Sequence, residues 1–185
     1  MAVTSIWAVH RSIKDALDYA ANPEKTENPN EEDLRRLMDY AENPDKTEQR
    51  YLISGVNCLP ELAYERMMET KRRYGKYGGI VAYHGYQSFK PGEVTPEQCH
   101  ALGVELAKRL WGDKYEVLVA SHRDHEHLHN HFILNSVSFK DGEKFHCPPY
   151  YHDTVMAPES DKLCREHGLS IIQNPQRKRA PYVAY

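Results

Sequence analysis

The sequence predicts a mixed α/β fold, of the α+β kind, with a largely antiparallel sheet. Segments of strand-like composition alternate with segments of helical periodicity along the whole chain. Two of the strand-like segments are separated by only a short turn, which favours antiparallel pairing. At 185 residues the chain is long enough to bury a substantial core in one domain.

Five segments are expected to be strands. The first, Val3–Val9, combines β-branched and aromatic residues without a breaker. The others are 52–56, 80–89, 115–121 and 128–139, and the last two should form an antiparallel hairpin.

Five helices are expected between and after these strands. The first begins at Ser12, a good N-cap, and ends at Asn22-Pro23. The most clearly marked helix covers 95–111, because Thr95-Pro96-Glu97-Gln98 combines a capping box with proline at the first helical position. The remaining predictions are 31–42, 62–74 with Met67 and Met68 in the core, 160–167 before Gly168, and a loose tail after Ile172.

The composition excludes some classes of protein. No apolar stretch approaches the ~18 residues of a membrane span, so membrane insertion is not expected. The first nine residues do not resemble a signal peptide. The four cysteines are far apart and form no C-x-x-C pair, which disfavours a zinc knuckle and favours reduced thiols in a cytoplasmic protein.

Charge is distributed unevenly. The net charge of −3 argues weakly against nucleic-acid binding. However, residues 15–48 carry eleven acids and four bases, so the rest of the chain is net basic. Basic clusters occur at Lys71-Arg72-Arg73 and Arg177-Lys178-Arg179. Such clusters are equally typical of a solvated surface, so alone they do not indicate a DNA-binding site.

The most informative segment holds five histidines within ten residues, His122, His125, His127, His129 and His131. Neutral imidazoles are good ligands for divalent metals near pH 7. An apolar run, Phe132–Val137, follows at once and is typical of a buried strand. The segment therefore predicts a metal site at the edge of a folded core.

Strand geometry limits which histidines share one ion. Residues two apart on a strand lie ~6.7 Å apart on one face, whereas His127, His129 and His131 together span ~13 Å. A single site should use two neighbours of this trio and a third ligand. If 123–126 form the turn, His122 lies opposite His127 and supplies that ligand, and Asp124 can orient an imidazole. The pair can be His127/His129 or His129/His131, and a purely structural zinc site is the alternative.

A repeated segment presents two tyrosines. Leu17–Glu27 recurs 21 residues later as Met38–Glu48, with Tyr19 and Tyr40 at equivalent places one turn before a helix end. Two segments that each end a helix can share capping residues, but capping alone does not require the two copies to match so closely. For each tyrosine taken alone, packing at a helix end is an equally good interpretation.

Taken together, the motifs resemble those of conjugative relaxases, in the P-type branch of the HUH endonuclease superfamily found on integrative conjugative elements. The run from His122 to His131 and the apolar strand after it resemble the third relaxase motif. Three further stretches agree in order, namely 18–26 with the tyrosine motif, 84–93 with the central motif and 160–170 with the closing helix.

The resemblance implies a fold and a reaction. The fold is a central five-stranded, mainly antiparallel sheet flanked by helices, with histidines on central strands facing the tyrosine helix. The reaction is site- and strand-specific nicking at an origin of transfer through a covalent 5′-phosphotyrosine, which frees a 3′ hydroxyl. Residues 1–185 would form a single nuclease domain, the N-terminal part of a longer protein.

The resemblance also implies roles for individual residues. The metal ligands would be His122, His129 and His131, supported by Asp124 and His127 and more weakly by His84. Tyr19 is the expected nucleophile and Tyr40 the second candidate, and the two can also act in turn. Expected DNA contacts are Lys71, Arg72, Arg73, Gln87, Ser88, Lys90, Arg177, Lys178 and Arg179.

One divalent ion is implied, Mg²⁺ or Mn²⁺ in function, with Zn²⁺ or Ni²⁺ possible. The implied partners are single-stranded or locally melted origin DNA, an accessory DNA-binding protein and a type IV coupling protein, in the bacterial cytoplasm. Alternatives are a rolling-circle replication initiator, a non-catalytic module that stacks single-stranded DNA on its thirteen tyrosines, and a hydrolytic metallophosphoesterase. The last is disfavoured because few carboxylates lie beside the histidines.

Overall fold

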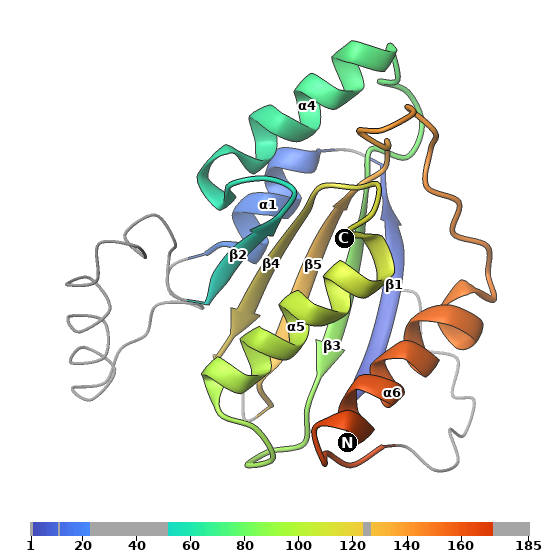
Figure 1. The fold of residues 1–185 in the computed structure, drawn as a ribbon. Helices are drawn as coiled ribbons and strands as arrows, with labels where there is room; N and C mark the ends of the chain where they lie inside the picture. The colour runs from blue at the N-terminus through green and yellow to red at the C-terminus, as the bar shows by residue number, and fades with distance from the viewer. Residues whose placement is uncertain (1, 11, 23–51, 124–126, 172–185) are drawn as a thin grey trace.

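A five-stranded antiparallel sheet, ordered β1-β3-β5-β4-β2, is the centre of the computed structural model (Figure 1). The structure describes residues 2–10, 12–22, 52–123 and 127–171. The strands are β1 (Val3–Val9), β2 (Ile53–Val56), β3 (Ala82–Ser88), β4 (Val117–His122) and β5 (His129–Asn135). The helices are α1 (Ile13–Ala20), α4 (Ala63–Tyr74), α5 (Pro96–Trp111) and α6 (Ala157–Glu166), with a 3₁₀ turn at Pro60–Leu62 and a π-helical turn at His152–Met156.

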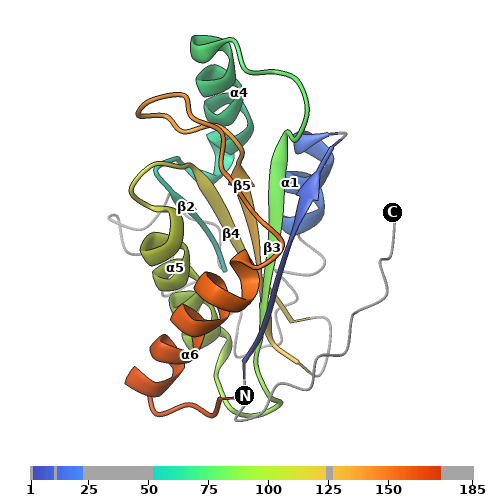
Figure 2. The same cartoon turned by 90° about the vertical axis from the view of Figure 1, so that its right-hand side faces the viewer.

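Helices cover both faces of the sheet (Figure 2). On one face α5 and α6 enclose a core that includes Phe132 of β5 and Trp111 of α5. On the other face α1 and α4 enclose a second core, in which Leu17 and Met67 pack against Ile133 of β5. Successive residues of β5 therefore point into different cores, as the period of two requires.

The helices that were predicted most accurately are those whose first residues carry a local capping signal. The Ser12 hydroxyl accepts a hydrogen bond from the Asp15 N–H and caps α1. The capping box of Thr95 and Gln98 forms at the start of α5, which ends at Trp111 as predicted. The predicted β1 bounds are also confirmed. In α4 the Met67 side chain is fully buried, whereas Met68 is only partly buried.

The β4–β5 hairpin differs from the prediction. Its connection covers 123–128 rather than 123–126, so His122 lies opposite His129 and not opposite His127. This register also pairs Leu118 with Ile133 on the α1 side, so both apolar side chains enter the same core. The two registers keep every side chain on the same face, and the observed one differs in placing apolar residues opposite apolar residues across the hairpin.

The end of the domain also differs. The last helix begins at Ala157, three residues earlier than predicted. It is continuous with the π-helical turn before it. β5 ends at Asn135 rather than at Phe139. The predicted helix 31–42, Tyr40 and the basic tail lie outside the described residues. None of the described helices is long and apolar enough to cross a membrane.

Candidate metal centre and facing tyrosine

The structure brings three histidines together on the α1 side of the sheet. His122 ends β4, and His129 and His131 lie two residues apart on β5. Their ring centroids are 4.2–5.2 Å apart, and one nitrogen from each ring lies within 4.8 Å of the others. All three side chains are buried. These are the three ligands that the relaxase resemblance implies.

Backbone carbonyls orient two of these rings. His122 Nε2 donates to the Ala20 carbonyl at 2.8 Å, and His129 Nδ1 donates to the His127 carbonyl at 2.9 Å. Because a carbonyl only accepts, each of these nitrogens carries the ring proton. In a neutral imidazole the opposite nitrogen, Nδ1 of His122 or Nε2 of His129, then holds the lone pair that binds a metal.

His84 plays the same part for the third ring. It lies on β3, is 8% exposed, and its Nε2 is 2.7 Å from His131 Nδ1. Burial, and secondarily the neighbouring His122, lowers the pKa of His84 to about 4, so its imidazole is neutral near pH 7. A neutral His84 can accept a hydrogen bond from His131 Nδ1–H at its Nε2, and in that tautomer Nε2 of His131 holds the lone pair that binds a metal.

This donor set fits a divalent transition metal. Neutral nitrogen donors suit such ions, and three protein ligands leave open positions, as catalytic sites need. One nitrogen from each ring lies within 4.8 Å of the others, so ring rotations that shorten these separations would bring all three to the ~2.1 Å metal–nitrogen distance from one ion. The surrounding hydrogen bonds already fix which nitrogens point inward.

Tyr19 stands over this cluster from α1. Its ring lies edge-on to His131, His122 and His84, at centroid distances of 5.6, 5.9 and 6.1 Å. The side chain is 49% exposed, whereas the histidines beneath it are buried. The next residue, Ala20, provides the carbonyl that holds His122, so one helix end positions both the tyrosine and a histidine.

The other two supporting candidates are placed differently. The His127 side chain is exposed, and its recorded contribution is the backbone carbonyl that orients His129. Asp124 lies outside the described residues, as does Tyr40.

Sequence reasoning missed two aromatic neighbours of the cluster. Trp7 of β1 lies against His84, at 4.5 Å between centroids and 38° between planes, and Tyr86 of β3 lies against His129 at 5.1 Å. The alternation of β3 already puts Tyr86 on the His84 face. The pairing of Trp7 with His84 depends on the β1–β3 register, which the sequence does not reveal.

Two of the predicted DNA contacts have side chains that are buried in the structure. Gln87 is 0% exposed and points to the opposite face of the sheet, where its Nε2 donates to the Ser160 hydroxyl at 3.0 Å. Lys71 is 2% exposed and donates to the Ser136 hydroxyl at 2.9 Å. Burial, followed by repulsion from Lys144, lowers the pKa of Lys71 to about 8.

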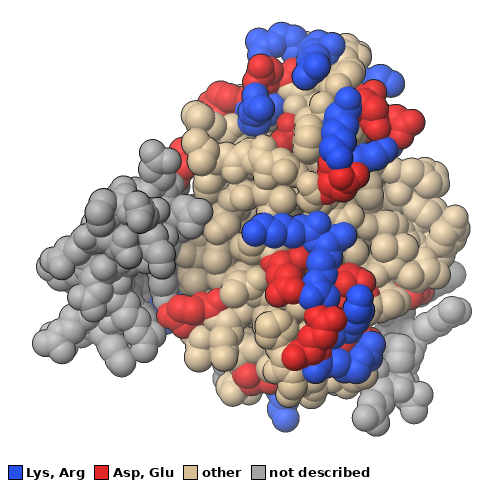
Figure 3. Space-filling view, in the orientation of Figure 1, with Lys and Arg blue, Asp and Glu red and all other residues tan. Residues whose placement is uncertain are grey.

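The other predicted contacts divide by position. Ser88 is 9% exposed at the end of β3, opposite His129. Arg72, Arg73 and Lys90 are exposed. In Figure 3 basic side chains gather over α4 among acidic ones, and a band of both signs crosses α5 and α6. The cluster 177–179 lies outside the described residues.

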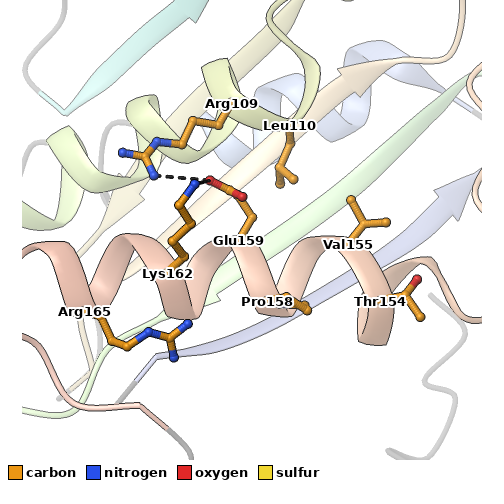
Figure 4. Close-up of a pocket in the computed structure, with 8 residues that line it drawn as sticks. All are labelled: Arg109, Leu110, Thr154, Val155, Pro158, Glu159, Lys162 and Arg165. Carbon is orange, nitrogen blue, oxygen red and sulfur yellow. Dashed lines mark hydrogen bonds and ion pairs between the residues drawn. The ribbon is translucent and has the colours of Figure 1, made fainter.

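A separate hollow of about 430 Å³ lies between α5 and α6 (Figure 4). It is lined by Arg109, Leu110, Thr154, Val155, Pro158, Glu159, Lys162 and Arg165. Arg109 is already paired with Glu159, Glu105 and Glu166. Both helices pack on the face of the sheet opposite the histidines, so this hollow is not part of the metal site.

Comparisons with known proteins agree with this arrangement. A family model described as "Relaxase: MobA/VirD2-like, nuclease domain" matches residues 40–169. The protein rlx of Staphylococcus aureus is 45% identical over 120 residues, covering 65% of this chain and 38% of that protein. The group II intron-interrupted relaxase LtrB of Lactococcus lactis is 31% identical, covering 94% of this chain and 38% of that protein. The chain thus spans well under half the length of these relatives.

The fold has a solved counterpart. A structure described as "Molecular Basis of Vancomycin Resistance Transfer in Staphylococcus aureus" aligns with a TM-score of 0.53 over 92% of this chain and 96% of that one, at 14% identity. This likeness confirms the predicted α+β fold with its five-stranded sheet. The family match covers most of the chain, including all three clustered histidines. The chain therefore belongs to the MobA/VirD2-like family of relaxase nuclease domains.

Proposed function

We propose that this domain nicks one DNA strand at an origin of transfer and remains joined to it through Tyr19. The observation that supports the proposal is the position of Tyr19, half exposed above a buried set of three histidines. Relatives named as relaxases support the same class of reaction. The longer protein would also need an accessory DNA-binding protein and a type IV coupling protein.

The reaction is a transesterification. The Tyr19 hydroxyl loses its proton to solvent, which its exposure permits, and the oxygen attacks the scissile phosphorus. A tyrosine–phosphate bond forms, the bond from phosphorus to the 3′ oxygen breaks, and the departing 3′ oxygen takes a proton from water. The 5′ phosphate stays on the protein, so the phosphodiester can later be restored without an external energy source.

The histidines would hold the metal and His84 would keep His131 in the productive orientation. A divalent ion bound by His122, His129 and His131 supplies Lewis-acid stabilisation of charge on the phosphate oxygens. Mg²⁺ or Mn²⁺ is proposed for the functional ion, although nitrogen-rich sites hold Zn²⁺ or Ni²⁺ more tightly. The Ala20 carbonyl holds His122 beside Tyr19, which fixes the position of the proposed nucleophile relative to the proposed metal site.

The test is adduct formation with a single-stranded oligonucleotide that carries the element's origin, in Mn²⁺ or Mg²⁺. We expect the wild type to form a covalent adduct, Tyr19→Phe to form none and Tyr40→Phe to retain it. Mass spectrometry of the cross-linked peptide identifies the tyrosine. An adduct from the Tyr19→Phe, Tyr40→Phe double variant would overturn the tyrosine mechanism, and loss in Tyr40→Phe alone would move the role to Tyr40.

A further inference from the structure

Trp7 is an exposed aromatic side chain at the edge of the sheet. β1 is an edge strand, and Trp7 is 45% exposed on the face that carries the histidines. Among the described residues, helix α1 contacts the sheet mainly at β4 and β5. The chain's other tryptophan, Trp111, is 2% exposed in the opposite core. Tryptophan combines a large apolar ring with a polar N–H and is enriched where proteins bind partners.

The indole is held in place from beneath. The β1–β3 register pairs Trp7 with His84, and the centroids of the two rings are 4.5 Å apart. His84 in turn is hydrogen-bonded to His131, the proposed ligand. Only one ring therefore separates the indole from the metal site. The Tyr19 ring also lies near His84, at 6.1 Å between centroids, and is about half exposed.

These positions define the ligand that suits Trp7. If a phosphate binds above the histidines and is attacked by Tyr19, the adjoining nucleotide lies close enough to reach Trp7 at the edge of the cluster. A flat indole offers a stacking surface to any base, and stacking of this kind tolerates all sequences. A base inside a duplex has both faces covered, so only an unpaired base can use the surface.

We propose that Trp7 stacks on an unpaired base of a nucleotide next to the scissile phosphate and thereby fixes the position of the strand over the histidines. The proposal rests on the function proposed above and adds a base-binding subsite to it. Trp7 is thus a substrate-binding residue that supplies affinity without reading the identity of the base.

The first experiment uses the intrinsic fluorescence of the two tryptophans without added metal, so that no cleavage occurs. Because Trp111 is buried and its Nε1 donates to Tyr151, a quencher that stacks on the surface reports on Trp7. We expect poly(dT) to quench wild-type emission and Trp7→Phe to show no such quenching. The duplex poly(dA)·poly(dT) should quench weakly. Equal quenching by single strand and duplex would overturn the proposal.

The second experiment locates the base. A series of origin oligonucleotides carries one abasic nucleotide at a time. One abasic position next to the nick should weaken binding to the wild type about tenfold. The same abasic position should not change the affinity of Trp7→Leu, because this variant retains apolar area but has no aromatic ring. Trp7→Phe should keep part of the effect. Tyr77→Ala, which removes an equally exposed aromatic outside the site, is the matched control.

The outcomes separate this proposal from the proposed function. If the wild type forms an adduct but no abasic position distinguishes it from Trp7→Leu, the base subsite is wrong and the nicking function stands. If no adduct forms while poly(dT) still quenches Trp7, the subsite stands and the nicking function fails. If Trp7→Leu changes the sedimentation coefficient rather than DNA affinity, the surface is a protein contact and the subsite is wrong.

Discussion

At the scale of single residues, the candidate site depends on what the second nitrogen of each imidazole contacts. His122 and His129 are oriented by backbone carbonyls, and His131 by the side chain of His84. The relaxase resemblance indicated which histidines meet, because their spacing is part of a known motif. It also indicated His84 as a supporting residue, but not the carbonyls of Ala20 and His127, because a backbone carbonyl has no sequence signal.

His84→Ala should weaken binding of Mn²⁺ by about 10–100-fold, because His131 loses the group that fixes its tautomer. Isothermal titration calorimetry measures the change, and thermal unfolding shows whether the fold is retained. His146→Ala, an exposed histidine outside the cluster, is the control and should leave the affinity unchanged. Unchanged affinity in a folded His84→Ala variant would contradict the supporting role of His84.

Gln87 shows why side-chain roles on a strand are hard to predict. The relaxase resemblance made Gln87 an expected DNA contact, but the side-chain alternation of β3 turns it to the α5 side, where it is buried. There it accepts a hydrogen bond from Asn130, which also binds Ser121 and the Cys99 carbonyl. Asn130 lies between His129 and His131 in sequence. This buried polar network therefore fixes β5, which carries two of the clustered histidines, from the opposite face of the sheet.

At the scale of elements, prediction succeeded where the signal was local and failed where it was not. The Ser12 cap and the Thr95 capping box mark helix starts within four residues, and both helices begin as expected. The hairpin register depends instead on packing against two cores formed by distant segments. The early start of α6 was missed because the helix continues a π-helical turn at His152–Met156, which has no local signal in the sequence.

The packing of α5 on the sheet gives a test of this network. A methyl group at Gly103 of α5 would lie 2.5 Å from the Asn130 side chain, so no side chain fits between the helix and β5. We expect Gly103→Ala to lower the free energy of unfolding by ~1–3 kcal/mol, measured by urea denaturation. Gly78→Ala has open space around the added methyl and should change it by less than ~0.5 kcal/mol. Equal effects would show that the close approach is not important for stability.

At the scale of the whole molecule, burial of histidines couples stability to pH. His100 of α5 bonds through its two ring nitrogens with Ser54 and Ser121, and burial lowers its pKa from 6.5 to about 4. Between these values the unfolded chain binds a proton at this position that the folded chain does not. The free energy of unfolding therefore falls as the pH drops from about 6.5 toward 4.

Urea unfolding at about pH 7 and pH 5 tests this coupling. The free energy of unfolding should fall more between these two pH values in the wild type than in His100→Gln, because glutamine cannot take up a proton. His146→Gln replaces an exposed histidine and should retain the wild-type dependence. An identical loss in His100→Gln and the wild type would show that another group controls the effect.

The hydrogen bond from His122 to the Ala20 carbonyl joins parts of the chain 102 residues apart. During synthesis on the ribosome, the helix that carries Tyr19 emerges long before the strands that carry His122, His129 and His131. A nascent or truncated chain that ends before β4 thus contains Tyr19 and none of the three clustered histidines. Under the proposed function, such a chain would lack the histidines that hold the metal, so nicking competence would arrive only when the late hairpin docks onto the early helix.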